Sequence, residues 1–146
     1  MDPTCKLGRG VYVWGSPDGF KFSLISGPHL SYSDTQAVLF FHNLLNKYVV
    51  YFRTHDRRPD LQECPGNTHS PAHRSIGQLL VSDLSAEDWG PGDRNQTKAV
   101  SVLNVDDQDP PCLDIYTSAA HAIADAVILH PMMCVLPFLY RNKQRY

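Results

Sequence analysis

The sequence is poor in the motifs that usually reveal a function. It contains no C-x2-C pair, no glycine-rich phosphate-binding loop and no strand–turn–helix segment carrying a nucleophile. Zinc knuckles, nucleotide-binding loops and hydrolase elbows therefore have no motif to support them. This absence assigns no catalytic residues and no resident cofactor, and it favours a non-enzymatic protein over an enzyme without deciding between them.

Neither sign of charge is in large excess. The formal net charge is −2 and 19% of the residues are charged. The chain therefore lacks a global field that would recruit nucleic acid or acidic lipid, and any such binding must be local.

Residues 1–10 lack a basic stretch followed by an apolar one, so we expect no secretory signal. The apolar segment 115–140 is interrupted by His121, Asp125 and Pro131, so we expect no membrane span. The cysteines stand singly in the sequence, at Cys5, Cys64, Cys112 and Cys134. Single cysteines in a reducing compartment remain free thiols, and together these features predict an intracellular protein, cytoplasmic or nuclear.

The length and apolar content fit one domain. With 146 residues and 42% hydrophobic side chains, the chain can bury a core of its own. We therefore predict a single domain over residues 1–146. Two polar stretches rich in proline and glycine, residues 54–75 and 84–96, have too few large apolar side chains to form core elements and are predicted to be long loops.

The densest apolar stretch, residues 33–53, predicts a helix followed by a strand. Apolar side chains recur there at helical spacing, at Ala37, Phe40, Phe41, Leu44, Leu45 and Tyr48. The helix should run from near Asp34 to about Asn46. The β-branched and aromatic residues that follow favour a strand to about Arg53.

A second helix is predicted after Asp109-Pro110, which supply an N-cap and a proline for the first helical turn. A helical stripe follows, at Cys112, Tyr116, Ala119, Ala120, Ile123, Val127 and Ile128. Pro131 should end this helix.

A β-hairpin is predicted near the start of the chain. Residues 11–14 and 20–25 are strand-like, and the Ser16-Pro17-Asp18-Gly19 sequence between them is typical of a type I turn. Phe20, Phe22 and Leu24 alternate with polar residues, so they should form the buried face of the second strand.

Two more strands are predicted at residues 76–81 and 97–105, the second of them buried on both faces. The resulting fold class is α+β, with a mostly antiparallel sheet of about five strands packed against two helices in the order ββαβββα.

The leading functional prediction is a non-enzymatic protein-protein interaction module. The chain has more large apolar side chains than such a small fold can bury, and exposed ones mark partner surfaces. The candidate contact residues are Trp14, Trp89, Met132, Met133 and Phe138. Self-association as a homodimer, through a sheet edge or the C-terminal apolar segment, is one form of this prediction.

Two alternatives come from charged and metal-ligating residues. A nucleic-acid-binding protein would use basic side chains in the first polar loop and the C-terminal tail, namely Arg53, Arg57, Arg58, Arg74, Arg141, Lys143 and Arg145. A zinc-dependent hydrolase would use the C-x4-H-x3-H array and the histidine before it, namely His55, Cys64, His69 and His73.

Overall fold

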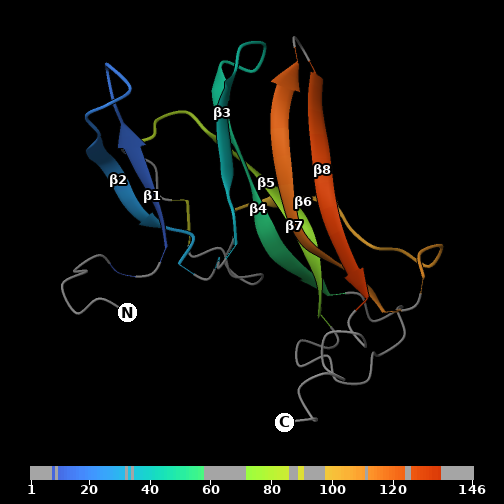
Figure 1. Cartoon of the computed structure of the whole chain (residues 1–146). Helices are drawn as coiled ribbons and strands as arrows, with labels where there is room; N and C mark the ends of the chain where they lie inside the picture. Colours follow the sequence, from blue (N-terminus) through green and yellow to red (C-terminus); the bar gives the residue numbers. More distant parts are fainter. Residues whose placement is uncertain are drawn as a thin grey trace.

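The computed structural model describes residues 8, 10–31, 33, 35–57, 72–85, 89–90, 98–110, 112–123 and 126–135. In these ranges the chain forms eight strands in three antiparallel sheets and no helix (Figure 1). The predicted α+β class is therefore wrong, and the described part of the chain is mostly β. Over the same ranges, a search for a helix long and apolar enough to cross a membrane finds none.

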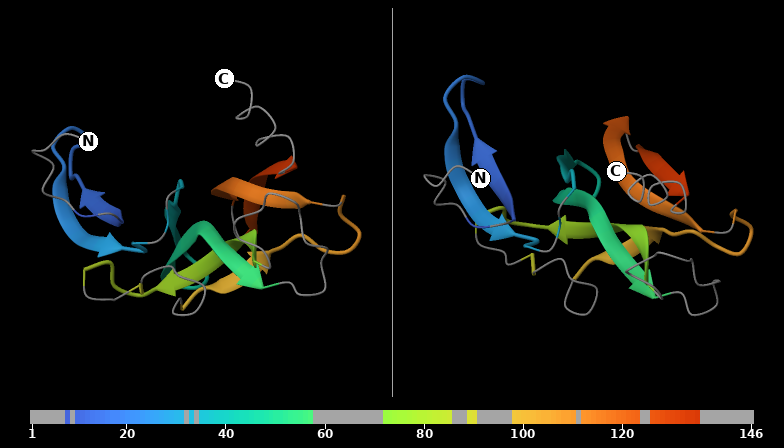
Figure 2. Two further views of the ribbon diagram at one scale, coloured as in Figure 1. Left: turned by 90° about the horizontal axis from the view of Figure 1, so that it is seen from below. Right: turned by 60° about the horizontal axis from the view of Figure 1, so that its bottom comes forward.

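Within each sheet, neighbouring strands are consecutive in the sequence and antiparallel. They are β1 (Val11–Gly15), β2 (Ser23–His29), β3 (Val38–His42), β4 (Lys47–Arg57), β5 (Ala72–Val81), β6 (Val100–Leu103), β7 (Leu113–Ile123) and β8 (Ala126–Val135). β1 and β2 form the N-terminal hairpin, β3 to β6 form the central sheet in that order, and β7 and β8 form the C-terminal hairpin. The two hairpins lie on either side of the central sheet (Figure 2).

Two apolar layers hold these three sheets together, and both start from β4. Successive residues of a strand point to opposite faces of its sheet. Val50 and Phe52 accordingly pack in a buried cluster with Val13 of the N-terminal hairpin. Val49 and Tyr51 pack in a second cluster with Ile115 of the C-terminal hairpin. The uninterrupted apolar run of β4 is thus explained by burial on both faces.

Trp89 completes the first layer from outside the strands. Its side chain is 1% exposed and its ring stacks on that of His29, with centroids 4.2 Å apart. The backbone N–H of Leu30 donates to the carbonyl of Gly90 at 3.0 Å. A short segment of the predicted 84–96 loop therefore belongs to the core.

The prediction of a buried strand over 97–105 is wrong in one respect. β6 lies at the edge of the central sheet, next to β5 alone. Val100 is 66% exposed and Val102 is 40% exposed. The strand buried on both faces is β4, whose sequence carries larger and more continuous apolar side chains.

The predicted N-terminal hairpin is present, since β1 and β2 pair antiparallel, but its second strand runs over Ser23–His29 and not over the predicted residues 20–25. Its turn is organised by Asp18, whose carboxylate accepts from the backbone N–H groups of Lys21 and Phe20 at 2.9 Å. Those hydrogen bonds, with that of Lys21 the largest contribution, lower the pKa of Asp18. The predicted burial of Phe20 and Phe22 is wrong, because they are 90% and 61% exposed.

The first predicted helix is in fact the hairpin of β3 and β4. The two strands pair from Val38 with Tyr51 to His42 with Lys47, and the residues between them form a turn. Asn46 adopts a φ of 48° in that turn, a left-handed conformation that asparagine tolerates better than most residues. The helical spacing was therefore the chance product of one strand and a turn containing two leucines.

The second predicted helix is the C-terminal hairpin. β7 and β8 pair over nearly their whole length, and Pro131 lies inside β8 opposite Ser118. Proline lacks an N–H, which is acceptable in β8 because β7 is its only neighbour in the described sheet. The alanines of residues 119–122 favour a helix locally, but packing against the central sheet outweighs that weak preference.

The long loop predicted over 54–75 is shorter at both ends, because residues 54–57 belong to β4 and residues 72–75 to β5. Residues 58–71 lie outside the described part of the chain.

The prediction that all cysteines are free thiols is wrong for Cys112. This residue, just before β7, is disulfide-bonded. Spacing along the sequence could not reveal the bond, because cysteine pairing depends on which segments the fold brings together.

Candidate functional site

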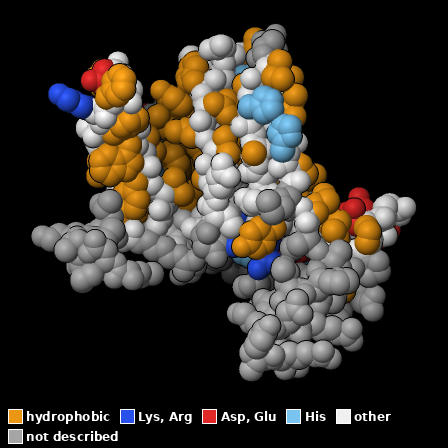
Figure 3. Space-filling view, in the orientation of Figure 1, with side chains coloured by type: hydrophobic (Ala, Val, Ile, Leu, Met, Phe, Trp, Pro, Cys, Tyr) orange, Lys and Arg blue, Asp and Glu red, His pale blue; other side chains and the backbone are white. Residues whose placement is uncertain are grey.

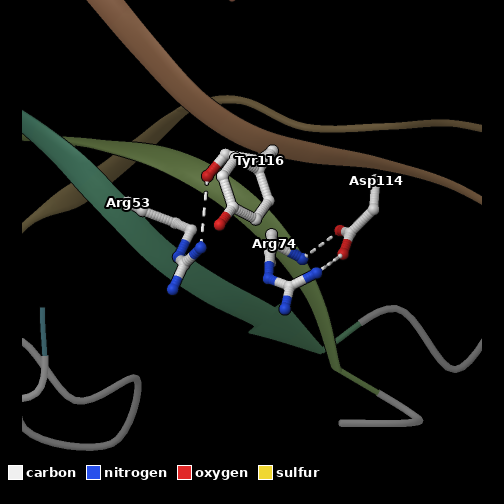
Figure 4. A network of polar contacts seen from close by, with 4 residues as sticks. All are labelled: Arg53, Arg74, Asp114 and Tyr116. Atoms are coloured by element: carbon white, nitrogen blue, oxygen red, sulfur yellow. Dashed lines mark hydrogen bonds and ion pairs between the residues drawn. The ribbon is translucent and has the colours of Figure 1, made fainter. Parts of the chain in front are cut away.

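Four side chains from three strands meet where the C-terminal hairpin crosses the central sheet. They are Arg53 of β4, Arg74 of β5, and Asp114 and Tyr116 of β7 (Figure 4). We call this group the arginine–tyrosine site. Arg53 and Asp114 are buried, and Tyr116 is 42% exposed.

Asp114 is held by Arg74 through two contacts. One carboxylate oxygen accepts from the backbone N–H of Arg74 at 2.6 Å, and the other accepts from its Nη1 at 2.8 Å. Burial raises the pKa of Asp114, while the hydrogen bonds and charge of Arg74 oppose that rise. Burial has the larger effect, so Arg74 only partly offsets the cost of removing the Asp114 carboxylate from water.

Tyr116 is presented by an irregularity in β7. The pairing of β7 with β8 shifts between Ile115 and Thr117, so Tyr116 falls outside the regular register. Such an irregularity changes the direction of a side chain and frees backbone groups from the ladder. The Tyr116 carbonyl accepts instead from Nη1 of Arg53 at 3.3 Å.

Both guanidinium groups also lie near the ring of Tyr116. The Cζ atoms of Arg53 and Arg74 are 5.4 and 5.7 Å from the ring centroid, within the range of cation–π attraction. This arrangement fixes the C-terminal hairpin on the central sheet and leaves part of an aromatic ring at the surface.

The second feature of interest is a row of exposed apolar side chains on the N-terminal hairpin, which we call the aromatic row. Its members are each 43% to 90% exposed, and they are Trp14, Phe20, Phe22, Leu24 and Ile25. Trp14 and Leu24 are direct cross-strand partners. Hydrophobic side chains cover much of this hairpin on the face seen in Figure 3.

The predicted partner-binding residues are divided by the structure. Trp14 and Met133 are exposed, at 48% and 45%, but they lie on opposite hairpins. Trp89 is in the core and presents almost nothing to a partner. The side chain of Met132 and all of Phe138 lie outside the described part of the structure.

The basic residues predicted to bind nucleic acid include two that face inward. Arg53 donates to the Tyr116 carbonyl and Arg74 is paired with Asp114. The side chain of Arg57 is not described, and Arg58, Arg141, Lys143 and Arg145 lie outside the described residues.

The predicted zinc ligands do not converge in the part that can be followed. His55 pairs with Arg74, whose chain neighbour is His73, so the alternation of the strand sends His55 and His73 to opposite faces. Cys64 and His69 lie outside the described residues. Among the residues that are described, no group of three possible metal ligands is present.

Asp114 and Tyr116 were missed by the sequence analysis because they lay in a segment assigned to a helix. A signal existed: Leu113-Asp114-Ile115-Tyr116 alternates apolar and polar residues at its start, as a strand does. The sequence did not show that Asp114 pairs with Arg74, because the two residues are 40 positions apart.

The sequence matches no protein-family model, and searches of curated proteins and of solved structures found no similar chain or fold.

Proposed function

We propose that this chain is a protein-binding β domain that associates through the aromatic row of its N-terminal hairpin. The observation that supports the proposal is the exposure of three large aromatic side chains, Trp14, Phe20 and Phe22, on one hairpin. Folded proteins rarely expose so many together without a partner, and tryptophan and other aromatics contribute much of the binding energy of interfaces.

The size of the row fits a specific interface. Large aromatic side chains bury about 150–250 Å² each, against about 800 Å² per partner in an interface of standard size. The aromatic row can therefore supply the apolar centre of an interface, with polar residues around it as a rim.

A second copy of the same chain is the partner that we propose. Asp18 and Lys21 carry opposite charges on either side of Phe20. In a two-fold symmetric pair, Asp18 of one copy can lie near Lys21 of the other while the aromatic side chains meet between them. The row is thus self-complementary in charge as well as in polarity.

The experiment is sedimentation velocity on the full chain over a wide concentration range, comparing wild type with a Phe20→Ser, Phe22→Ser double variant. Both side chains are exposed, so the fold should tolerate the change. Loss of an interface aromatic costs about 2 kcal/mol or more, so dimerisation should weaken at least about 30-fold. Val100→Ser, at a residue that is 66% exposed on β6, is the matched control and should leave the dimer unchanged.

A photo-crosslinking amino acid at position 22 separates a second copy from another protein partner. A crosslinked dimer supports self-association, whereas a crosslink to a different chain supports only the broader binding function. A strict monomer that also gives no crosslink would show that the aromatic row is not a binding surface.

The alternative functions gain no support from the described residues. Two of the arginines predicted to bind nucleic acid, Arg53 and Arg74, make contacts within the protein. The predicted zinc ligands His55 and His73 lie on opposite faces of the sheet. An intracellular location also stays a prediction, and the disulfide at Cys112 weighs against it, because such bonds persist mainly in oxidising compartments.

A further inference from the structure

The C-terminal hairpin carries two histidines side by side on its exposed face. His121 of β7 and His130 of β8 are both exposed. Their rings are stacked, with centroids 5.0 Å apart and an angle of 17° between the ring planes. Histidine side chains gather over β7 and β8 on the face seen in Figure 3.

The register of the hairpin explains why these side chains meet. His121 is paired with Ile128, and His130 is paired with Ala119. Residues two apart on a strand share a face, so both histidines occupy the same face as diagonal neighbours. The register is regular from Thr117 to Ile123, so regular strand pairing fixes the backbone positions of both histidines.

We propose that His121 and His130 form a two-imidazole site for a divalent transition-metal ion of the zinc class. Neutral imidazole is a preferred ligand of such ions, with zinc–nitrogen distances of about 2.0–2.1 Å. Two nitrogens on one tetrahedral ion then lie about 3.3 Å apart. The ring centroids are 5.0 Å apart, and rotation about the χ2 torsions, which are soft for histidine, can turn one nitrogen of each ring toward a shared ion.

The surroundings leave room for an ion and its water ligands. The residues paired with the two histidines are Ala119, a small side chain, and Ile128, and neither carries a charge that would repel a cation. Since both histidines are exposed, water can occupy the remaining coordination positions. The site is thus open, and it is separate from the aromatic row on the other hairpin.

Isothermal titration of the full chain with zinc chloride tests this site. Wild type should bind one zinc ion, and His121→Ala and His130→Ala should each weaken that binding at least about tenfold, because a lost ligand costs no less than a lost supporting group. Imidazole nuclear magnetic resonance signals of both histidines should shift together during the titration.

His69→Ala is the control, since it removes a histidine from the sequence array that also predicted zinc. If zinc binding survives both hairpin variants unchanged, or is lost only in the His69 variant, the two-imidazole site does not exist. Neither result bears on the aromatic row, whose test measures association without metal. A far-ultraviolet circular dichroism spectrum like that of wild type would show that each variant is folded.

Discussion

At the scale of single residues, Asp114 shows how burial and pairing oppose each other. Its carboxylate is 2% exposed, and its ion pair with Arg74 is nearly as well shielded from water. Removing a charge from water is expensive, and one partner recovers only part of that cost. The raised pKa of Asp114 is the measurable consequence.

This raised pKa predicts how stability depends on pH. A carboxyl group whose pKa is higher in the folded than in the unfolded state stabilises the fold below its ordinary pKa of 3.8, and that stabilisation is lost as the pH rises through the folded-state value. Asp114→Asn removes the titrating group. The difference in free energy of unfolding between wild type and this variant should therefore change in the variant's favour as the pH rises.

Urea denaturation of both proteins from acidic to neutral pH measures this difference. Asp107→Asn, at an exposed residue, is the control for loss of one negative charge. A difference that moves in favour of the wild type as the pH rises would mean that Arg74 outweighs burial at Asp114.

Trp89 gives a second prediction at this scale. It is 1% exposed and stacks on His29, so Trp89→Ala should lower the free energy of unfolding by about 3–5 kcal/mol. Trp14→Ala removes the same side chain at a site that is 48% exposed and should cost about 1 kcal/mol or less. Chemical denaturation measures both. Equal losses would contradict the assignment of Trp89 to the core and Trp14 to the surface.

At the scale of elements, the turn between β3 and β4 depends on a residue in the left-handed conformation. Asn46 has a φ of 48° there, and its N–H donates to the carbonyl of Asn43 at 3.2 Å. A β-branched residue fits this left-handed conformation badly, whereas glycine adopts it freely.

We therefore expect Asn46→Val to lower the free energy of unfolding by about 1–2 kcal/mol. Asn46→Gly, the matched control, should be close to neutral. Thermal denaturation of the three proteins measures the order. If valine were tolerated as well as glycine, Asn46 would not hold this left-handed conformation.

Both wrongly predicted helices arose because strand segments carried apolar residues at helical spacing. Over residues 37–48 a strand and a leucine-containing turn imitate the spacing of a helix. Over residues 113–130 the alanines and Pro131 imitate a helix and its end. The confirmed N-terminal hairpin differs because its turn has its own chemical signature in Asp18 and Gly19, which does not depend on packing.

At the scale of the whole molecule, Cys112, which lies just before the C-terminal hairpin, is disulfide-bonded. A cross-link stabilises mainly by restricting the unfolded chain, typically by about 2–4 kcal/mol. We expect Cys112→Ser, or reduction of the wild type, to lower the free energy of unfolding by that amount. Alkylation of the unfolded, unreduced protein followed by mass spectrometry should find fewer than four free thiols, and four would contradict the bond.

The packing of the two hairpins on the central sheet explains why apolar side chains remain exposed on their outer faces. The central sheet is covered on both faces by the hairpins, and each hairpin covers it with only one of its own faces. Trp14 on one side and Ile128 on the other therefore remain at the surface. The proposed binding row and the proposed metal site both lie on the hairpins for this reason.

The sequence by itself determined the features that depend on near neighbours: the hairpin built around Asp18, the apolar strand of β4 and the strand at β5. Only the tertiary structure decided that Arg53, Arg74, Asp114 and Tyr116 meet, that Trp89 is buried while Phe20 is not, and that His121 and His130 lie side by side. The physical reason is that local preferences are worth tenths of a kcal/mol per residue, whereas packing one sheet on another buries whole side chains at about 1.5–3 kcal/mol each. Where the two disagreed, as in residues 37–48 and 113–130, packing prevailed.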